Sequence, residues 1–105
     1  MSSFDDRQKG FENKYKHDQE LQFKVSARRN RLLGEWAAAK FGKADVAAYA
    51  KEVVASDFEK AGDSDVVEKL LADAKTAGVA LTEAEVRAQM DHLLPIAKKQ
   101  IMEQA

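Results

Sequence analysis

Apolar residues recur every three or four positions from about residue 21 to the end of the chain, and almost no stretch alternates apolar with polar residues. The first spacing is typical of amphipathic α-helices, whereas alternation is typical of strands. Four glycines, at positions 34, 42, 62 and 78, divide this part of the 105-residue chain, and three of them fall where an apolar stripe ends. The pattern therefore predicts an all-α fold, a four-helix bundle formed by a single domain.

The bounds of these helices follow from the stripes and from residues that cap helices. We expect helices at about 21–41, 45–61, 65–77 and from about 82 to the end. Their N-terminal signals are Asp45 as an N-cap, a capping-box-like Asp65 to Glu68, and a capping box from Thr82 to Glu85. The expected stops are Gly42, Gly62 and Gly78, because glycine adopts the left-handed conformation without strain.

Two residues inside the expected helices are unusual there. Gly34 costs a helix about 1 kcal/mol relative to alanine, and we interpret it as a point where a second helix approaches closely. Its neighbour Trp36 is most simply a core ring. Pro95 cannot donate a hydrogen bond to the Asp91 carbonyl, so we expect a kink or a local break in the last helix.

Charge and composition narrow the possible partners and locations. The chain has 17 Lys plus Arg and 18 Asp plus Glu, a net charge of −1, with eight basic and five acidic residues in positions 1–31. A chain so close to neutrality is not expected to bind nucleic acid. No apolar run approaches the roughly 20 residues that a membrane span needs, so we do not expect insertion into a membrane. The chain has no cysteine and no apolar leader, so we expect a cytoplasmic protein.

The sequence has no recognisable catalytic or cofactor motif. Glycine-rich phosphate loops are missing, and its two histidines lie far apart without a metal-ligand spacing. No serine has a plausible base near it in sequence. We therefore expect a protein that is not an enzyme and that holds no cofactor.

Residues 1–20 differ from the rest of the chain. Their apolar side chains beyond Met1 are three rings, Phe4, Phe11 and Tyr15, which share one side of a helix but cannot form a core. Such a segment buries too little area to offset the cost of ordering it, so alone it should be disordered or briefly helical. We therefore divide the chain into an arm, residues 1–20, and a bundle, residues 21–105. The rings have two interpretations of similar weight: the arm folds on a partner, or it packs back onto the bundle.

Arg28-Arg29-Asn30-Arg31 is the densest basic cluster. In one interpretation it is a solvated helix face, with Glu35 placed to pair with Arg31. In the other it is a docking patch for an acidic protein surface or for phosphate. The residues alone favour neither.

A family resemblance decides between the interpretations of the arm. Phe4-Asp5-Asp6-Arg7, the stretch 10–18, Ala27-Arg28-Arg29-Asn30 and Leu33-Gly34-Glu35-Trp36-Ala37-Ala38 together resemble the zeta inhibitor subunit of alphaproteobacterial F-type ATP synthases. Asp57-Phe58 and Gly62-Asp63 extend the resemblance over nearly the whole chain. The pair Tyr15-Lys16 departs from the family pattern, where Phe-Ala is expected.

The resemblance implies a function and a set of partners. It implies a four-helix bundle with a mobile arm, monomeric when free. The arm would become helical in an alpha–beta catalytic interface of the synthase head, with the gamma subunit as a further partner. There it would block rotation in the direction of ATP hydrolysis. Bound to the synthase, the protein would lie at the cytoplasmic face of the inner membrane. The expected partner-binding residues are Phe4, Asp5, Asp6, Arg7, Phe11, Glu12, Lys14, Tyr15 and Asp18 in the arm, with Arg28, Arg29 and Arg31 docking the bundle.

Two other functions stay open at this point. One is a bundle that binds purine nucleotides weakly as a sensor, through Trp36 and the basic cluster. The other is an adaptor that binds the synthase without inhibiting it.

Overall fold

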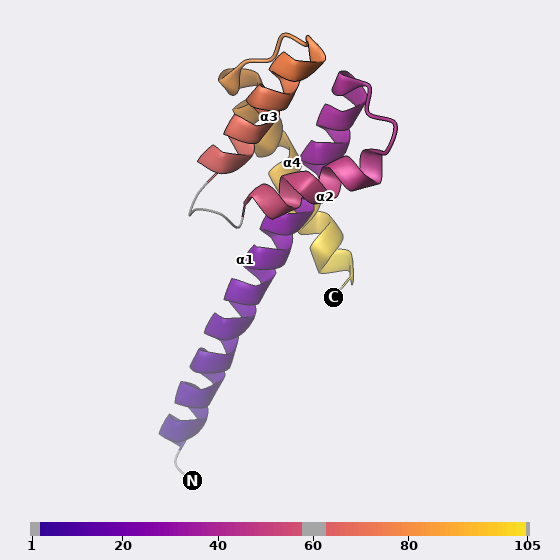
Figure 1. Ribbon diagram of the computed structural model, residues 1–105. Helices are drawn as coiled ribbons and strands as arrows, with labels where there is room; N and C mark the ends of the chain where they lie inside the picture. The colour runs from indigo at the N-terminus through magenta and orange to yellow at the C-terminus, as the bar shows by residue number, and fades with distance from the viewer. Residues whose placement is uncertain (1–2, 58–62, 105) are drawn as a thin grey trace.

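The computed structural model describes residues 3–57 and 63–104, with side chains over 19–57 and 63–103. Within these ranges it contains four α-helices and no strand: α1 (Ser3–Phe41), α2 (Val46–Ser56), α3 (Ser64–Ala77) and α4 (Glu83–Gln104) (Figure 1). The shorter helices α2 and α3 and the longer α4 gather around the C-terminal half of α1 (Figure 1). The predicted all-α fold of four packed helices is confirmed.

Capping side chains set the start of two helices, as predicted. The Asp45 carboxylate accepts a hydrogen bond from the Ala48 amide at 3.0 Å and caps α2. The Thr82 hydroxyl accepts one from the Glu85 amide at 3.2 Å at the start of α4. Each bond satisfies an amide that the first turn of a helix otherwise leaves without an acceptor.

Other helix ends differ from the prediction. The residue before α3 is Asp63, whose side chain makes no capping bond, so Asp65 lies in the first turn and the predicted capping box there is wrong. Helix α2 ends at Ser56, earlier than expected, and the expected stop Gly62 lies outside the described residues. Gly42 and Gly78 have φ angles of 68° and 71°, which confirms both as left-handed helix stops.

The core lies where all four helices meet. Its α1 residues belong to the C-terminal half of that helix, because no described side chain before Arg29 is buried. Leucine, valine and alanine dominate, at the three- and four-residue spacings that predicted the helices. The buried cluster consists of Leu33, Ala37, Ala38, Tyr49, Val53, Val66, Val67, Leu70, Val86, Met90 and Leu93, with Trp36 half-buried against it.

Gly34 lies where α1 and α2 approach each other closely. A Cβ atom at this position would lie 2.7 Å from the Ala50 Cα and 3.2 Å from the Val53 side chain. The first distance is shorter than real contacts allow, and the atom it meets is backbone. The interpretation of Gly34 as a point of close helix approach is confirmed.

Pro95 lies inside α4, which is continuous from Glu83 to Gln104. The predicted local break is therefore absent. Pro95 and Asp91 are both exposed, so water can bind the Asp91 carbonyl that has lost its helical donor.

A polar contact ties α2 to α3 at the edge of the core. The Tyr49 hydroxyl donates to the Asp73 carboxylate at 2.7 Å, and Lys69 lies 3.1 Å from the same carboxylate. Burial, together with the hydrogen bond to Asp73, raises the pKa of Tyr49. Burial alone would raise the pKa of Asp73, but the hydrogen bonds from Tyr49 and Lys69 and the charges of Lys69 and Lys43 outweigh it, so that pKa is lowered.

Helix α1 begins much earlier than predicted. We expected a helix from about residue 21, whereas the backbone is helical from Ser3 and passes through Gly10 without interruption. At 1.5 Å per residue, its 39 residues span about 58 Å. Its N-terminal half extends away from the other helices (Figure 1), and the molecule is 65 Å along its long axis but 25 and 21 Å across.

Candidate partner-binding surface

The predicted arm residues all lie on the N-terminal half of α1, where the backbone carries them away from the bundle (Figure 1). On an ideal helix, positions 4, 11 and 15 fall within about 40° of one another around the axis. The side chains of residues 1–18 are outside the described residues, so their contacts stay a prediction. The nine positions concerned are Phe4, Asp5, Asp6, Arg7, Phe11, Glu12, Lys14, Tyr15 and Asp18.

The three arginines predicted to dock the bundle do not form one patch. Arg29 is buried, with only 7% of its surface exposed. Its guanidinium donates to both carboxylate oxygens of Asp63, at 2.7 and 3.4 Å, and also to the Asn30 side-chain oxygen at 3.0 and 3.2 Å. Arg29 therefore holds the start of α3 against α1, and in this structure its charge is directed inward.

Arg31 and Arg28 lie nearer the surface. The Arg31 side chain is 58% exposed, and its Nε is 3.5 Å from Glu35, which confirms the predicted ion pair. The Arg28 guanidinium donates to Gln100 of α4 at 3.4 Å. Both arginines line a hollow of about 310 Å³ between α1 and α4 that also contains Glu35 and Glu103, so its charges balance.

We predict that Arg29→Ala destabilises the bundle by about 2–3 kcal/mol. The substitution leaves the Asp63 carboxylate and the buried Asn30 oxygen without their donor, although the half-exposed carboxylate regains some hydration. Arg31→Ala is the matched control, since an exposed ion pair contributes less than about 1 kcal/mol. Urea unfolding followed by circular dichroism measures both. Equal stability of the two variants would contradict the structural role of Arg29.

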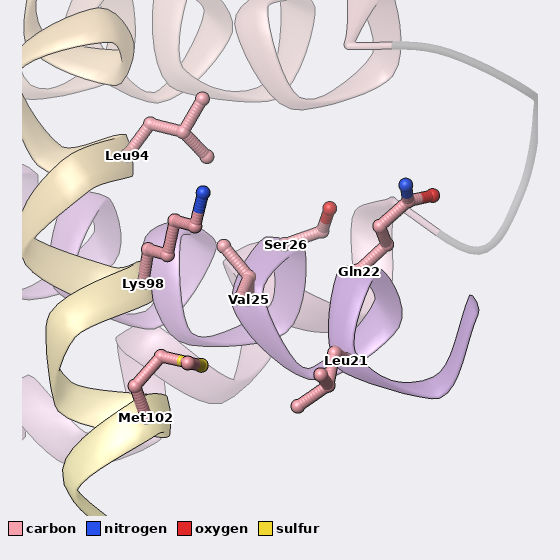
Figure 2. A pocket seen from close by; sticks show the side chains of 7 residues that line it. All are labelled: Leu21, Gln22, Val25, Ser26, Leu94, Lys98 and Met102. Atoms are coloured by element: carbon pink, nitrogen blue, oxygen red, sulfur yellow. The ribbon is translucent and has the colours of Figure 1, made fainter. Parts of the chain in front are cut away.

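A second hollow, the α1–α4 groove, lies where α1 leaves the bundle. Its volume is about 490 Å³. Figure 2 shows side chains of α4 along one side of it and side chains of α1 along the other. Its lining is mostly apolar, and consists of Leu21, Gln22, Val25 and Ser26 from α1 with Leu94, Lys98 and Met102 from α4.

This groove was not predicted from the sequence. The sequence does contain a pattern that marks it: Leu94, Lys98 and Met102 recur at four-residue intervals, one position beyond the core residues Leu93, Ala97 and Ile101. Such a second stripe is easily read as a widening of the core face. Only the position of α1 shows that Leu94 and Met102 remain exposed.

A metal site and a membrane-spanning helix are two further kinds of feature to consider among the described residues. No group of three or more His, Cys, Asp or Glu side chains in the described ranges is placed to hold a metal ion. No described helix is both long and apolar enough to cross a membrane. Trp36 packs against the core with the Lys40 ammonium 5.0 Å from its ring, in agreement with its predicted structural role.

A small helical bundle from which one long helix projects, with an apolar hollow at the base of that helix, is typical of proteins that act by binding a partner. A comparison with known families identifies it further. The family model of the ATPase inhibitor subunit zeta matches residues 1–100, so the chain belongs to this family. Its members are inhibitors associated with the F-type ATP synthase and are not enzymes. The predicted family, the predicted inhibitory role and the prediction that the protein is not an enzyme are therefore confirmed.

Comparison with solved structures agrees. A solution NMR structure of a protein 46% identical in sequence superposes with a TM-score of 0.70, covering 81% of this chain and 99% of the other. No protein with a curated functional description matches the sequence.

Proposed function

We propose that residues 1–20 are the inhibitory segment and that they act inside the synthase head. The arm enters an alpha–beta catalytic interface and, near the gamma subunit, blocks rotation in the direction of ATP hydrolysis. The observation that carries this proposal is the shape of α1, whose N-terminal half projects from the bundle while the buried residues of its described part begin at Arg29 (Figure 1).

The energetics of the arm fit a segment that gains its contacts from a partner. Each of Phe4, Phe11 and Tyr15 contributes about 1.5–3 kcal/mol when it leaves water completely. Ordering the segment opposes much of this gain, at about 1–2 kcal/mol per residue of backbone fixed. The charged arm residues between the rings then set the register through complementary charges on the synthase.

The bundle keeps the arm near its binding site. A covalently attached bundle that itself contacts the synthase raises the effective concentration of the arm. Of the three predicted docking arginines, Arg28 and Arg31 remain candidates for this contact, since both lie nearer the surface, whereas Arg29 is paired with Asp63 inside the protein. No specific contact among the described side chains, 19–57 and 63–103, supports nucleotide sensing or a non-inhibitory adaptor role.

Single ring substitutions test this proposal. We expect Phe4→Ala, Phe11→Ala and Tyr15→Ala each to raise the concentration for half-inhibition of ATP hydrolysis by about 10- to 100-fold, since 1.4 kcal/mol corresponds to a factor of ten. Phe23→Ala is the matched control, because Phe23 is an exposed ring on the same helix beyond the arm. Hydrolysis by the isolated cognate enzyme is the measurement. If the arm variants inhibit as well as the control, the arm is not the inhibitory segment.

A further inference from the structure

The α1–α4 groove keeps large apolar side chains in contact with water. Leu94 is 41% exposed and Met102 is 58% exposed, and both lie on the α4 side of the groove (Figure 2). Val25 of α1 lines the opposite wall. Single exposed apolar residues are ordinary, but several gathered in one hollow mark an interaction site.

We propose that this groove binds an amphipathic helix of the F-type ATP synthase, with a carboxylate on that helix opposite Lys98. From Leu94 to Met102 the groove follows nine residues of α4, a rise of about 12 Å, which is slightly more than two helical turns. An apolar groove of this length between two helices accepts the apolar stripe of a third helix.

The position of the groove favours the synthase over other occupants. Leu21, on its wall, is the first residue after the arm, and it lies on the same uninterrupted helix. A subunit that encloses residues 1–20 must therefore lie next to the groove. The inference rests in this respect on the proposed function of the arm.

The charge of the groove specifies the chemistry of the partner. Lys98 is the one charged residue among those lining the groove, and it is exposed. It has no carboxylate partner among the described side chains. A partner helix with an acidic residue at this point gains a complementary charge, whereas a basic one is repelled.

Charge substitutions in the groove test the inference on the full-length chain. We expect Leu94→Glu/Met102→Glu to raise the concentration for half-inhibition of ATP hydrolysis at least tenfold, with complete inhibition still reached at saturation because the arm is intact. Ile96→Glu is the matched control, since Ile96 is 37% exposed on α4 but does not line the groove. It should change that concentration less than twofold. Lys98→Glu should weaken inhibition by a factor that shrinks as salt is raised.

The control measurements separate this inference from the proposal about the arm. Thermal unfolding of all variants should match the wild type, because the substituted side chains are exposed. If the groove variants inhibit like Ile96→Glu while the ring variants of the arm lose inhibition, the groove inference is overturned and the arm proposal stands. If the ring variants keep their potency, the arm proposal fails, whatever the groove variants do.

Two other occupants have distinct signatures. A wild-type dimer in sedimentation that becomes monomeric in Leu94→Glu/Met102→Glu would show that the groove binds a second copy of the chain. Stronger inhibition by that variant would show that the groove shelters the chain's own arm. Either result would overturn the inference.

Discussion

Deleting residues 1–19 is expected to abolish inhibition of ATP hydrolysis while leaving the bundle folded. The buried residues of α1 begin at Arg29 within its described part, so the truncation removes none of the described core. It does remove all three rings that the proposed mechanism buries in the synthase. We expect no inhibition at a hundred times the concentration at which the full chain is half-effective, together with a melting temperature within a few degrees of the wild type.

Two further samples test whether the loss of inhibition comes from the ring-bearing segment. A chain that lacks only residues 1–3 retains Phe4 and should inhibit nearly as well as the full chain. A peptide of residues 1–20 should inhibit more weakly than the full chain by at least about tenfold, because a free segment of this length is marginally helical and lacks the tethering of the bundle. Inhibition that survives the deletion of residues 1–19 would place the inhibitory surface on the bundle.

Gly34→Ala should destabilise the bundle by about 1–3 kcal/mol, although alanine is the better helix former. In an exposed helix the same change stabilises by about 1 kcal/mol. Here the new Cβ would lie 2.7 Å from the Ala50 Cα, so that α1 and α2 must separate, as in an overpacked core. A bundle of this size should lose about 5–20 °C of its melting temperature, and Gly34→Leu should prevent folding.

The matched control for this prediction is Gly10→Ala. Gly10 is also helical, but it lies on the part of α1 that extends beyond the bundle (Figure 1), so its substitution should leave the unfolding transition unchanged. Ala50→Gly should not rescue Gly34→Ala, because the atom in the way is the Ala50 Cα rather than its methyl group. Full stability of Gly34→Ala in urea unfolding would show that the two helices separate at no cost.

Much of the fold could be predicted because its determinants are local. Asp45, Thr82, Gly42 and Gly78 cap or stop helices through contacts within a few residues, and each acts as its sequence context predicted. The capping box at Asp65 was wrong because the preceding Asp63 is held by Arg29, thirty-four residues away. That pairing depends on how α1 and α3 meet, and no local pattern contains it.

The features of the candidate binding surface also fall into those that the sequence predicted and those that depended on tertiary packing. The arm and its rings were identified from composition and from the family resemblance, and Gly34 from its cost inside a helix. The separation of the arginines into a buried Arg29 and the less buried Arg28 and Arg31 was not predicted, since these residues point to different sides of the helix and only the packing of α3 shows which side is covered. The α1–α4 groove was missed for the same reason.

The sequence by itself determined the class of fold, the helix ends at Gly42, Asp45, Gly78 and Thr82, a point of close helix contact at Gly34 and the segment that differs from the rest. These follow from periodicity and backbone preference, which act over a few residues. Tertiary structure alone decided which charges are buried, which apolar side chains stay in water and where α1 leaves the bundle. These properties depend on the angles at which helices cross, and crossing angles are set by the packing of distant residues against one another.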